Sequence, residues 1–421
     1  MTAMPHAFSG RASFAARVRP CRRPFHGALL CLALTLACTD EPPEQGEGSS
    51  GPGPAGTQSS EPGAEAGDTT GAAPIDSTST GDPAESSEGS DDTEQLPEPA
   101  DPVFVALADG GWTATSCDGG RTWVQHAFSD EIGDHTPWTA FGGLAFGNDG
   151  FVAGFGWGAP GHLLYSANGL DWEDLPAERF TEGGRVLGYD AHTSGVAFDG
   201  QQFLVFSAMN WRSDAGMAWE PAEIDLPPGS DQLRQLRGFP GGVLVASLES
   251  QSGEGHPVGH FVAVSEDGGQ TWTEGTGYAP DCSHPIQHWG DIELQDGTLL
   301  VGTRDLCRST DMGQTWDVIV DPAGADIQDL FADADGFGVV AGSRLLHSDD
   351  GLAWSEVADV GTNLAKAAYG GGTWAAVSDT GQEFFWSDDG TSWQPGTLET
   401  SRGDSVYIRD FAVGYPTAGC D

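Results

Sequence analysis

The chain has 421 residues, of which 62 are glycine, 26 are proline, 63 are Asp or Glu and only 17 are Lys or Arg. The formal net charge of −46 argues against nucleic acid as a partner, because phosphate binding needs clustered cations. The same charge disfavours adsorption of the protein itself to an anionic membrane surface.

The first 38 residues have the pattern of an export signal. Several arginines precede an apolar run at 27–37, which is too short to span a bilayer, and the run ends at Leu34-Thr35-Leu36-Ala37-Cys38. This segment resembles a bacterial lipoprotein signal. The resemblance implies a signal peptide at 1–37, a lipid anchor on Cys38 as the contact with the bilayer, and a place in the cell envelope, on the outer membrane or cell surface. The alternative is ordinary cleavage nearby, which leaves Cys38 as a thiol.

Residues 39–101 contain no Lys, Arg or aromatic residue and are rich in Gly, Ser, Thr, Pro and acids. Such a composition buries too little apolar surface to offset chain entropy, so we predict a disordered tether over 38–101. An acidic interaction tail is the competing interpretation.

The remaining chain, 102–421, contains seven copies of one short motif. Three copies read Ser-x-Asp-x-Gly-x-Thr-Trp, at 116–123, 265–272 and 309–316, and four copies one residue shorter lie at 166–172, 213–219, 348–354 and 387–393. Asp or Asn can accept hydrogen bonds from its own loop, Gly supplies positive φ, and we expect the Trp ring to anchor the turn against its sheet. A repeat of this length predicts a propeller or an array.

The motif resembles the Asp-box (BNR) repeat of the sialidase/sortilin-like superfamily. In that superfamily the box joins the third and fourth strands of a blade and is structural, so the resemblance assigns no box residue to catalysis. The structural box residues are then Asp118, Trp123, Asn168, Trp172, Trp219, Asp267, Trp272, Asp311, Trp316, Asp350, Trp354, Asp389 and Trp393.

Apolar runs around the boxes predict four strands per unit. Examples are 143–147, 151–155, 162–166 and 172–175 in the second unit, 292–294, 299–303 and 306–309 in the fifth, and 329–332, 338–342 and 345–348 in the sixth. The first unit has only two predicted strands before its box, 103–108 and 112–116, whereas one further predicted strand, 406–413, follows the last box. Joining these pieces closes a ring in one sheet. We therefore predict an all-β, seven-bladed β-propeller of residues 102–421, closed by a C-terminal strand that completes the first blade. An open solenoid is the alternative.

The propeller topology also predicts how the cysteines pair. The boxes and the turns between first and second strands lie on one face of the propeller, which we name the turn face. The other connections lie on the opposite face, which we name the loop face. Cys117 and Cys420 both fall on the turn face, whereas Cys282 and Cys307 both fall on the loop face. Two disulfides are therefore predicted, Cys117–Cys420 and Cys282–Cys307. The alternative for the second pair is a zinc site with His284 and His288, but we assign no metal or other cofactor.

Propeller loops on the loop face are the expected place for a ligand, because loops on a rigid scaffold commonly carry binding residues. The candidate ligand-binding residues are His135, Trp138, Trp157, Arg185, His192, Arg237, His256, His284, His288, Trp289 and Arg409. Arg234, Arg237, Lys366 and Arg409 fall on or near inner strands. They could hold an anionic ligand, but we favour that they balance the carboxylates Asp291, Asp326, Asp329 and Asp410.

No catalytic residue is assigned. A sialidase needs three arginines, a Tyr–Glu pair and an acidic residue, usually with an Arg-Ile-Pro motif near the propeller start, and that motif does not occur. The sequence offers Arg185, Arg237, Arg409 and Tyr407 for such roles, but nothing in it fixes the geometry of these residues relative to one another. Another type of glycoside hydrolase would need a pair of carboxylates, and the loop carboxylates that could supply it are Asp130, Asp134, Glu178, Asp190, Asp281 and Asp404. We expect a monomeric, non-catalytic propeller that binds a protein or glycan, with a sialidase-like or other glycoside hydrolase as the alternative.

Overall fold

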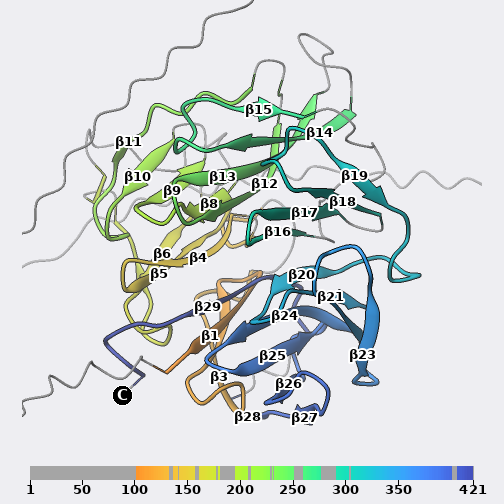
Figure 1. The fold of residues 1–421 in the computed structure, drawn as a ribbon. Helices are drawn as coiled ribbons and strands as arrows, with labels where there is room; N and C mark the ends of the chain where they lie inside the picture. The colour runs from red at the N-terminus through yellow and green to blue at the C-terminus, as the bar shows by residue number, and fades with distance from the viewer. Residues whose placement is uncertain are drawn as a thin grey trace, which may run out of the picture. The chain divides into compact units, whose positions relative to one another are not determined.

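The computed structural model describes residues 101–131, 136–140, 142–156, 161–176, 179–180, 195–206, 210–227, 230, 232–250, 259–275, 291–302, 305–400 and 405–420. Within these ranges the chain is all-β and forms the seven sheets of a seven-bladed β-propeller (Figure 1). The same ranges contain no helix with the length and apolar character needed to cross a membrane.

The blades follow in chain order, and the strands of each blade run from the innermost outward. Blade 1 has β29 (Ile408–Gly414), β1 (Val103–Ala108), β2 (Trp112–Ser116), β3 (Thr122–Ala127) and β28 (Thr397–Thr400). Blades 2 and 3 have β4 (Gly143–Gly147), β5 (Gly150–Gly154), β6 (Leu163–Ser166), β7 (Glu173–Asp174), then β8 (Gly195–Phe198), β9 (Phe203–Phe206), β10 (Trp211–Ser213) and β11 (Glu220–Pro221). Blades 4 and 5 have β12 (Gln232–Phe239), β13 (Val243–Ser250), β14 (Gly259–Ser265), β15 (Thr273–Glu274), then β16 (Asp291–Gln295), β17 (Thr298–Gly302), β18 (Leu306–Ser309) and β19 (Asp317–Ile319). Blades 6 and 7 have β20 (Asp329–Ala332), β21 (Phe337–Ala341), β22 (Arg344–Ser348), β23 (Ser355–Asp359), then β24 (Leu364–Gly370), β25 (Thr373–Ser378), β26 (Phe384–Ser387) and β27 (Gln394–Pro395).

The ring closes within blade 1 as predicted. The C-terminal strand β29 pairs antiparallel with β1, with Val103 opposite Gly414 and Leu107 opposite Asp410. The strand begins two residues later and ends one residue later than the 406–413 predicted. Because β29 is the innermost strand of a sheet that otherwise begins the propeller, the two ends of the domain are joined by backbone hydrogen bonds, and no open seam remains.

Blade 1 also has an edge strand that the sequence did not predict. β28 lies parallel to β3, with Thr397 opposite Thr122 and Leu398 opposite Trp123. The chain leaves blade 7 at β27 and must travel to the centre of blade 1, so it first passes along the outer edge of that blade. This contact covers an edge that four strands would leave exposed.

The two predicted disulfides have different outcomes. Cys117 and Cys420 are bonded, with their Cα atoms 5.9 Å apart, and they join the β2–β3 turn of blade 1 to the C-terminal tail. Cys307 is buried in β18 and is also disulfide-bonded. Its predicted partner, Cys282, lies outside the described residues, so the Cys282–Cys307 pairing stays a prediction.

The repeated turn has the hydrogen bonds that its residue types suggest. In blade 1, Asp118 Oδ1 accepts the N–H groups of Arg121 and Thr122 at 3.0 and 2.8 Å. The Trp123 indole N–H donates to the carbonyl of Gly120, whose φ is +83°. In blade 3 the carboxylate position is an alanine, yet Ser213 and Trp219 keep their bonds to Gly216. The Ser, Gly and Trp positions therefore suffice for the turn.

The turn tryptophans pack between blades rather than against their own sheet alone, which corrects the expectation. Trp123 of blade 1 is fully buried and stacks on Phe384 of blade 7, with ring centroids 4.3 Å apart. Each of the seven turn tryptophans belongs to the apolar cluster that its blade forms with the preceding blade. The repeat therefore sets the contact between neighbouring blades.

Glycines allow the inner strands of some blades to pack closely. The Phe198 ring of β8 lies over Gly147 of β4, and the Phe146 ring lies over Gly414 of β29. A Cβ at either glycine would lie 2.3 Å from the facing ring. Contacts between neighbouring inner strands continue around the whole ring, in the order β29, β4, β8, β12, β16, β20 and β24. These seven strands form the wall of the central channel.

Candidate functional site at the propeller axis

A buried ion pair crosses the centre of the channel. Arg237, on β12 of blade 4, donates to Asp291 on β16 of blade 5 through Nε at 2.9 Å and Nη2 at 2.7 Å. The same guanidinium reaches Asp410 on β29 of blade 1 through two bonds of 2.9 Å. Blades 1 and 4 lie on opposite sides of the ring, so this side chain spans the axis.

Lys366 extends the network to two further blades. Its ammonium, on β24 of blade 7, donates to Asp291 at 2.9 Å and to Asp329 on β20 of blade 6 at 2.7 Å. Lys366 is 7% exposed and each of the two carboxylates is 4% exposed, so these charges are held almost without water. Pairing of this kind is required, because an isolated buried charge is strongly unfavourable.

Two of the carboxylates also accept backbone hydrogen bonds from the next blade. Asp410 accepts the N–H of Leu144 at 2.8 Å, and Asp329 accepts the N–H of Ala367 at 2.9 Å. Inner strands of neighbouring blades have no sheet hydrogen bonds with each other, so these carboxylates supply the missing acceptors. The axial network therefore holds blades together as well as closing the channel.

Burial and pairing shift the titration of these groups in opposite directions. Burial raises the pKa of Asp291, but Arg237 and Lys366 outweigh it and bring the pKa far below its usual value. Burial raises the pKa of Asp329 to about 8 despite Lys366, with Asp291 adding to the rise. Burial and the nearby Asp291 also raise the pKa of Glu293 to about 8. Burial thus opposes ionisation of Asp329 and Glu293, whereas the two cations favour ionisation of Asp291.

Glu293 differs from its neighbours because no cation pairs with it. Within the described residues it has no ion pair, and the hydrogen bond that it accepts is a 3.3 Å contact from the N–H of Leu294. It was not among the residues predicted from the sequence. A signal was present, since β16 reads Asp-Ile-Glu-Leu-Gln and places two acids on an inner strand.

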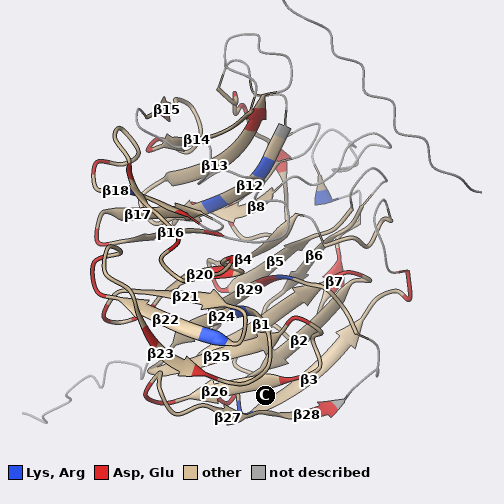
Figure 2. Cartoon of the chain, turned by 90° about the vertical axis from the view of Figure 1, so that its right-hand side faces the viewer, with Lys and Arg blue, Asp and Glu red and all other residues tan. Residues whose placement is uncertain are grey.

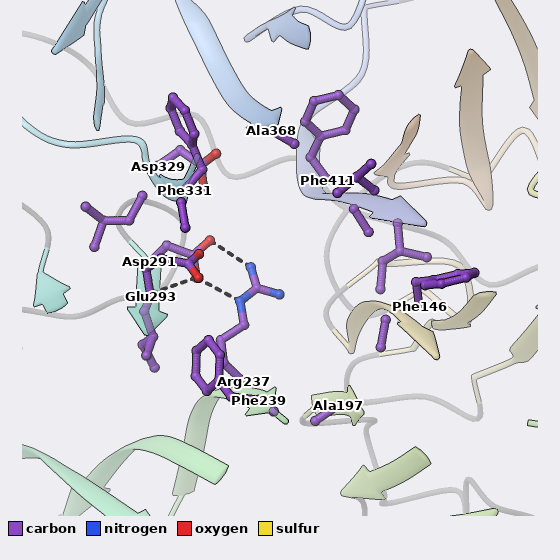
Figure 3. A pocket seen from close by; sticks show the side chains of 18 of the residues that line it. Phe146, Ala197, Arg237, Phe239, Asp291, Glu293, Asp329, Phe331, Ala368 and Phe411 are labelled. Atoms are coloured by element: carbon purple, nitrogen blue, oxygen red, sulfur yellow. Dashed lines mark hydrogen bonds and ion pairs between the residues drawn. The ribbon is translucent and has the colours of Figure 1, made fainter. Parts of the chain in front are cut away.

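A cavity of about 310 Å³ lies beside this network. Its lining runs from Arg237, Asp291 and Asp329 along the inner strands toward their C-terminal ends, so the cavity lies on the turn-face side of the charged network. Figure 3 shows Arg237, Asp291 and Glu293 on one side of this space and Phe146 on the other. Six aromatic side chains contribute to the lining: Phe146, Phe198, Phe239, Phe331, Tyr369 and Phe411.

The other inner-strand cations also have carboxylate partners. Arg409 is held by Asp109 through bonds of 3.2 and 2.8 Å, and Arg234 is paired with Glu249. Arg237 and Lys366 thus pair with three of the four carboxylates that we expected, whereas Arg409 and Arg234 pair with carboxylates that we did not name. Asp326, which we expected in the same layer, is instead exposed.

Trp138, a candidate for ligand stacking, is stacked against two neighbouring rings. Its ring centroid lies 5.7 Å from that of Phe128 and 3.8 Å from that of His162. His162 is in turn bonded to Asp174 at 2.8 Å. The structure thus gives Trp138 a packing role between blades 1 and 2.

Most other candidates lie outside the described residues. These are His135, Trp157, Arg185, His192, His256, His284, His288 and Trp289, together with the loop carboxylates Asp134, Glu178, Asp190, Asp281 and Asp404. Asp130 lies within the described residues. Tyr407 is exposed, and its ring centroid lies 5.9 Å from the guanidinium carbon of Arg409. Among the described residues, no three His, Cys, Asp or Glu side chains are placed to hold a metal ion.

Comparison with known proteins gives matches in structure but not in sequence families. No family model matches the chain. No curated protein matches it either. The solved structures similar to it include YCF48 from Cyanidioschyzon merolae, with 15% identity, a TM-score of 0.44, and coverage of 70% of this chain and 90% of that one. A streptogramin B lyase has 11% identity, a TM-score of 0.47, and coverage of 74% and 98%.

A third similar structure is the GH74 xyloglucanase from Xanthomonas campestris. Its identity is 15% and its TM-score 0.42, with 69% of this chain and 46% of that chain covered. YCF48 and the streptogramin B lyase are seven-bladed β-propellers. At such low identity these similarities concern the fold alone.

Proposed function

We propose that this protein is an exported, membrane-tethered, non-catalytic β-propeller that binds a protein or glycan through its loop face. The observation that carries the proposal is the state of two inner-strand arginines. Arg237 is engaged by Asp291 and Asp410, and Arg409 is engaged by Asp109. A sialidase would need such arginines free to grip the carboxylate of its substrate.

The energetics support this interpretation. Moving Arg237 or Arg409 toward a substrate would leave buried aspartates without their cation, and an unpaired buried charge costs several kcal/mol. A substrate carboxylate would have to compete with carboxylates already held in bidentate geometry. These guanidiniums therefore stabilise the propeller, and recognition is assigned to the loops.

The tether and the location belong to the same proposal. The segment over 39–101 lacks Lys, Arg and aromatic residues, and it follows a cysteine placed as in a lipoprotein signal. A flexible chain of this length reaches roughly 40–50 Å, which would hold a monomeric propeller away from the envelope surface. Labelling with an alkyne fatty acid in a bacterial host tests the anchor: the native protein should be labelled, whereas Cys38→Ser should not.

Two assays on the exported protein test the binding function. We expect saturable binding to a defined glycan on an array or to a purified envelope protein, without hydrolysis of fluorogenic sialosides or xyloglucan oligosaccharides. Turnover that disappears in Tyr407→Phe would instead establish the sialidase-like alternative. An Arg212→Gln variant, altered in an exposed pair with Glu220, serves as the matched control for both assays.

A further inference from the structure

The cavity at the axis has a chemistry of its own, separate from the loop face. Arg237, Asp291 and Asp329 of the charged network line it, and Lys366 and Asp410 pair with these residues without lining the cavity. Glu293 also lines it, two residues nearer the turn face than Asp291 on β16. Both cations are fully used by the three aspartates. Among the described residues, Glu293 is thus the cavity acid that forms no ion pair with a cation.

The approach to the cavity is also acidic. The hairpins that connect the inner strands to the second strands of blades 2 to 7 contain no Lys or Arg. They contain instead Asp149, Asp199, Asp296, Asp333 and Asp335. Figure 2 shows acidic residues at many strand ends, with cations confined to few positions such as those on β12 and β22. A mouth lined by one sign of charge attracts ligands of the opposite sign.

The lining of the cavity is mixed, with aromatic side chains beside the charged groups and Glu293 among them. Tyr369, Phe198 and Phe146 line the cavity and are only partly buried. Aromatic faces attract ammonium and guanidinium groups, most strongly where water is excluded. A carboxyl group beside aromatic side chains in a cavity is an arrangement that suits an organic cation with an alkyl stem.

We propose that this cavity binds an organic cation, an alkylammonium or guanidinium group, with Glu293 as its counter-ion and the aromatic side chains around its stem. The cation enters from the turn face, so this site is distinct from the loop-face binding of the proposed function and does not depend on it. Two sources carry this group: a free amine and a basic side chain of a protein.

Binding of a cation is coupled to the protonation of Glu293. The charged groups around it are Asp291 on β16, Arg237 on β12, Asp329 on β20, Lys366 on β24 and Asp410 on β29. Because the pKa of Glu293 is raised to about 8, the group holds its proton at pH 7 in the free protein. A bound cation favours the ionised form, so binding at pH 7 should release a proton and should become tighter as the pH rises toward 8.

Isothermal titration calorimetry of the full chain tests the site with three blocked amino acids. The N-acetyl methylamides of lysine and arginine are the probes, and that of norleucine is the uncharged control of similar length. We expect at least one cation to bind at least tenfold more tightly than norleucine. Its apparent enthalpy at pH 7 should differ between phosphate and Tris buffers because a proton is released. Equal binding of norleucine, preference for N-acetylglutamate methylamide, or no binding of either cation at millimolar concentration would overturn the proposal.

Variants assign the effect to the site. Glu293→Gln should weaken cation binding at least tenfold and abolish the buffer dependence, whereas Glu383→Gln, the same change at an exposed position, should leave both unchanged. Tyr369→Leu is a second variant that keeps Glu293, and it should weaken cation binding while retaining proton release. Unchanged binding in either cavity variant contradicts the assignment.

A seven-residue peptide with one central lysine distinguishes the two sources of the cation. Tighter binding of the peptide than of the single residue indicates a protein ligand, and weaker binding indicates a free amine.

Discussion

Arg237 and Asp410 meet across the centre of the propeller, joined by two hydrogen bonds of 2.9 Å between residues 173 positions apart in the chain. Asp410 lies on β29, the strand that closes the ring by pairing with β1. The same carboxylate also accepts the N–H of Leu144 from blade 2. One ion pair therefore links the closing strand to the far side of the ring and to the next blade.

Replacing the arginine of this pair should destabilise the whole domain. Arg237→Gln leaves Asp410 and Asp291 buried with fewer partners, and breaking a buried pair from one side costs about 3–5 kcal/mol. We expect a decrease of that size in the free energy of unfolding, measured by urea denaturation. Arg212→Gln removes an exposed pair with Glu220 and should cost less than about 1 kcal/mol. Similar losses in the two variants would show that the axial pair has no special weight.

The Cys117–Cys420 bond should stabilise the closed ring. It joins residues 303 positions apart, for which the chain-entropy model gives an upper limit of roughly 5–6 kcal/mol. Because β29 already pairs with β1, the measured loss in Cys117→Ser should be smaller, about 2–4 kcal/mol. Thermal unfolding of Cys117→Ser, Cys420→Ser and the double variant provides the check. All three should have the same stability, and additive losses would mean that each cysteine contributes by packing instead.

The close approach of β8 to β4 should make Gly147 intolerant of a side chain. Gly147→Ala places a methyl group 2.3 Å from the Phe198 ring, so the ring or the strand must move. Overpacking of this kind costs about 1–3 kcal/mol. Chemical denaturation should show that loss in Gly147→Ala and a partial recovery when Phe198→Leu is added. If the double variant is no more stable than the sum of the single changes predicts, the clash is not the cause.

Local patterns predicted the strands and the closure. Alternating apolar runs and the repeated Ser, Gly and Trp positions specify each blade by itself, and β1, β2, β4, β18 and β20 have the predicted bounds. The missing strand of the first unit then required a partner at the far end of the chain. The Cys117–Cys420 pairing followed from the same topology, because strand direction decides on which face each cysteine lies.

Contacts between blades were harder to predict, because they join residues far apart in the sequence. Trp123 was expected to lie against its own sheet, yet its stacking partner Phe384 comes from the last blade. Asp410 and Arg237 were both recognised as inner-strand charges, but their pairing across the axis depends on the number of blades and on side-chain length. The importance of Glu293 is likewise visible only when its neighbours are known, since the absence of a cation partner among the described residues is a property of the assembled ring.

Glu293 should make the propeller less stable as the pH rises from acid to neutral. Its pKa is raised from about 4.5 to about 8 in the folded protein, so the folded state keeps a proton that the unfolded state loses. A group with a raised pKa gives its full stability below pH 4.5, and that stability is lost as the pH rises toward 8. Glu293→Gln removes this loss, because the amide cannot ionise. We expect the variant to be about 1–3 kcal/mol more stable than the native protein at pH 8 and nearly equal to it at pH 4.

Urea denaturation at several values between pH 4 and pH 9 measures this effect. The native protein should lose stability across this range relative to Glu293→Gln, whereas Glu383→Gln should follow the native curve, because its side chain is exposed. A slope should remain in Glu293→Gln, since burial also raises the pKa of Asp329 to about 8. A difference between native and variant that is constant with pH would mean that Glu293 already carries its charge at neutral pH, and the cavity would then have a fixed negative charge rather than a proton-coupled one.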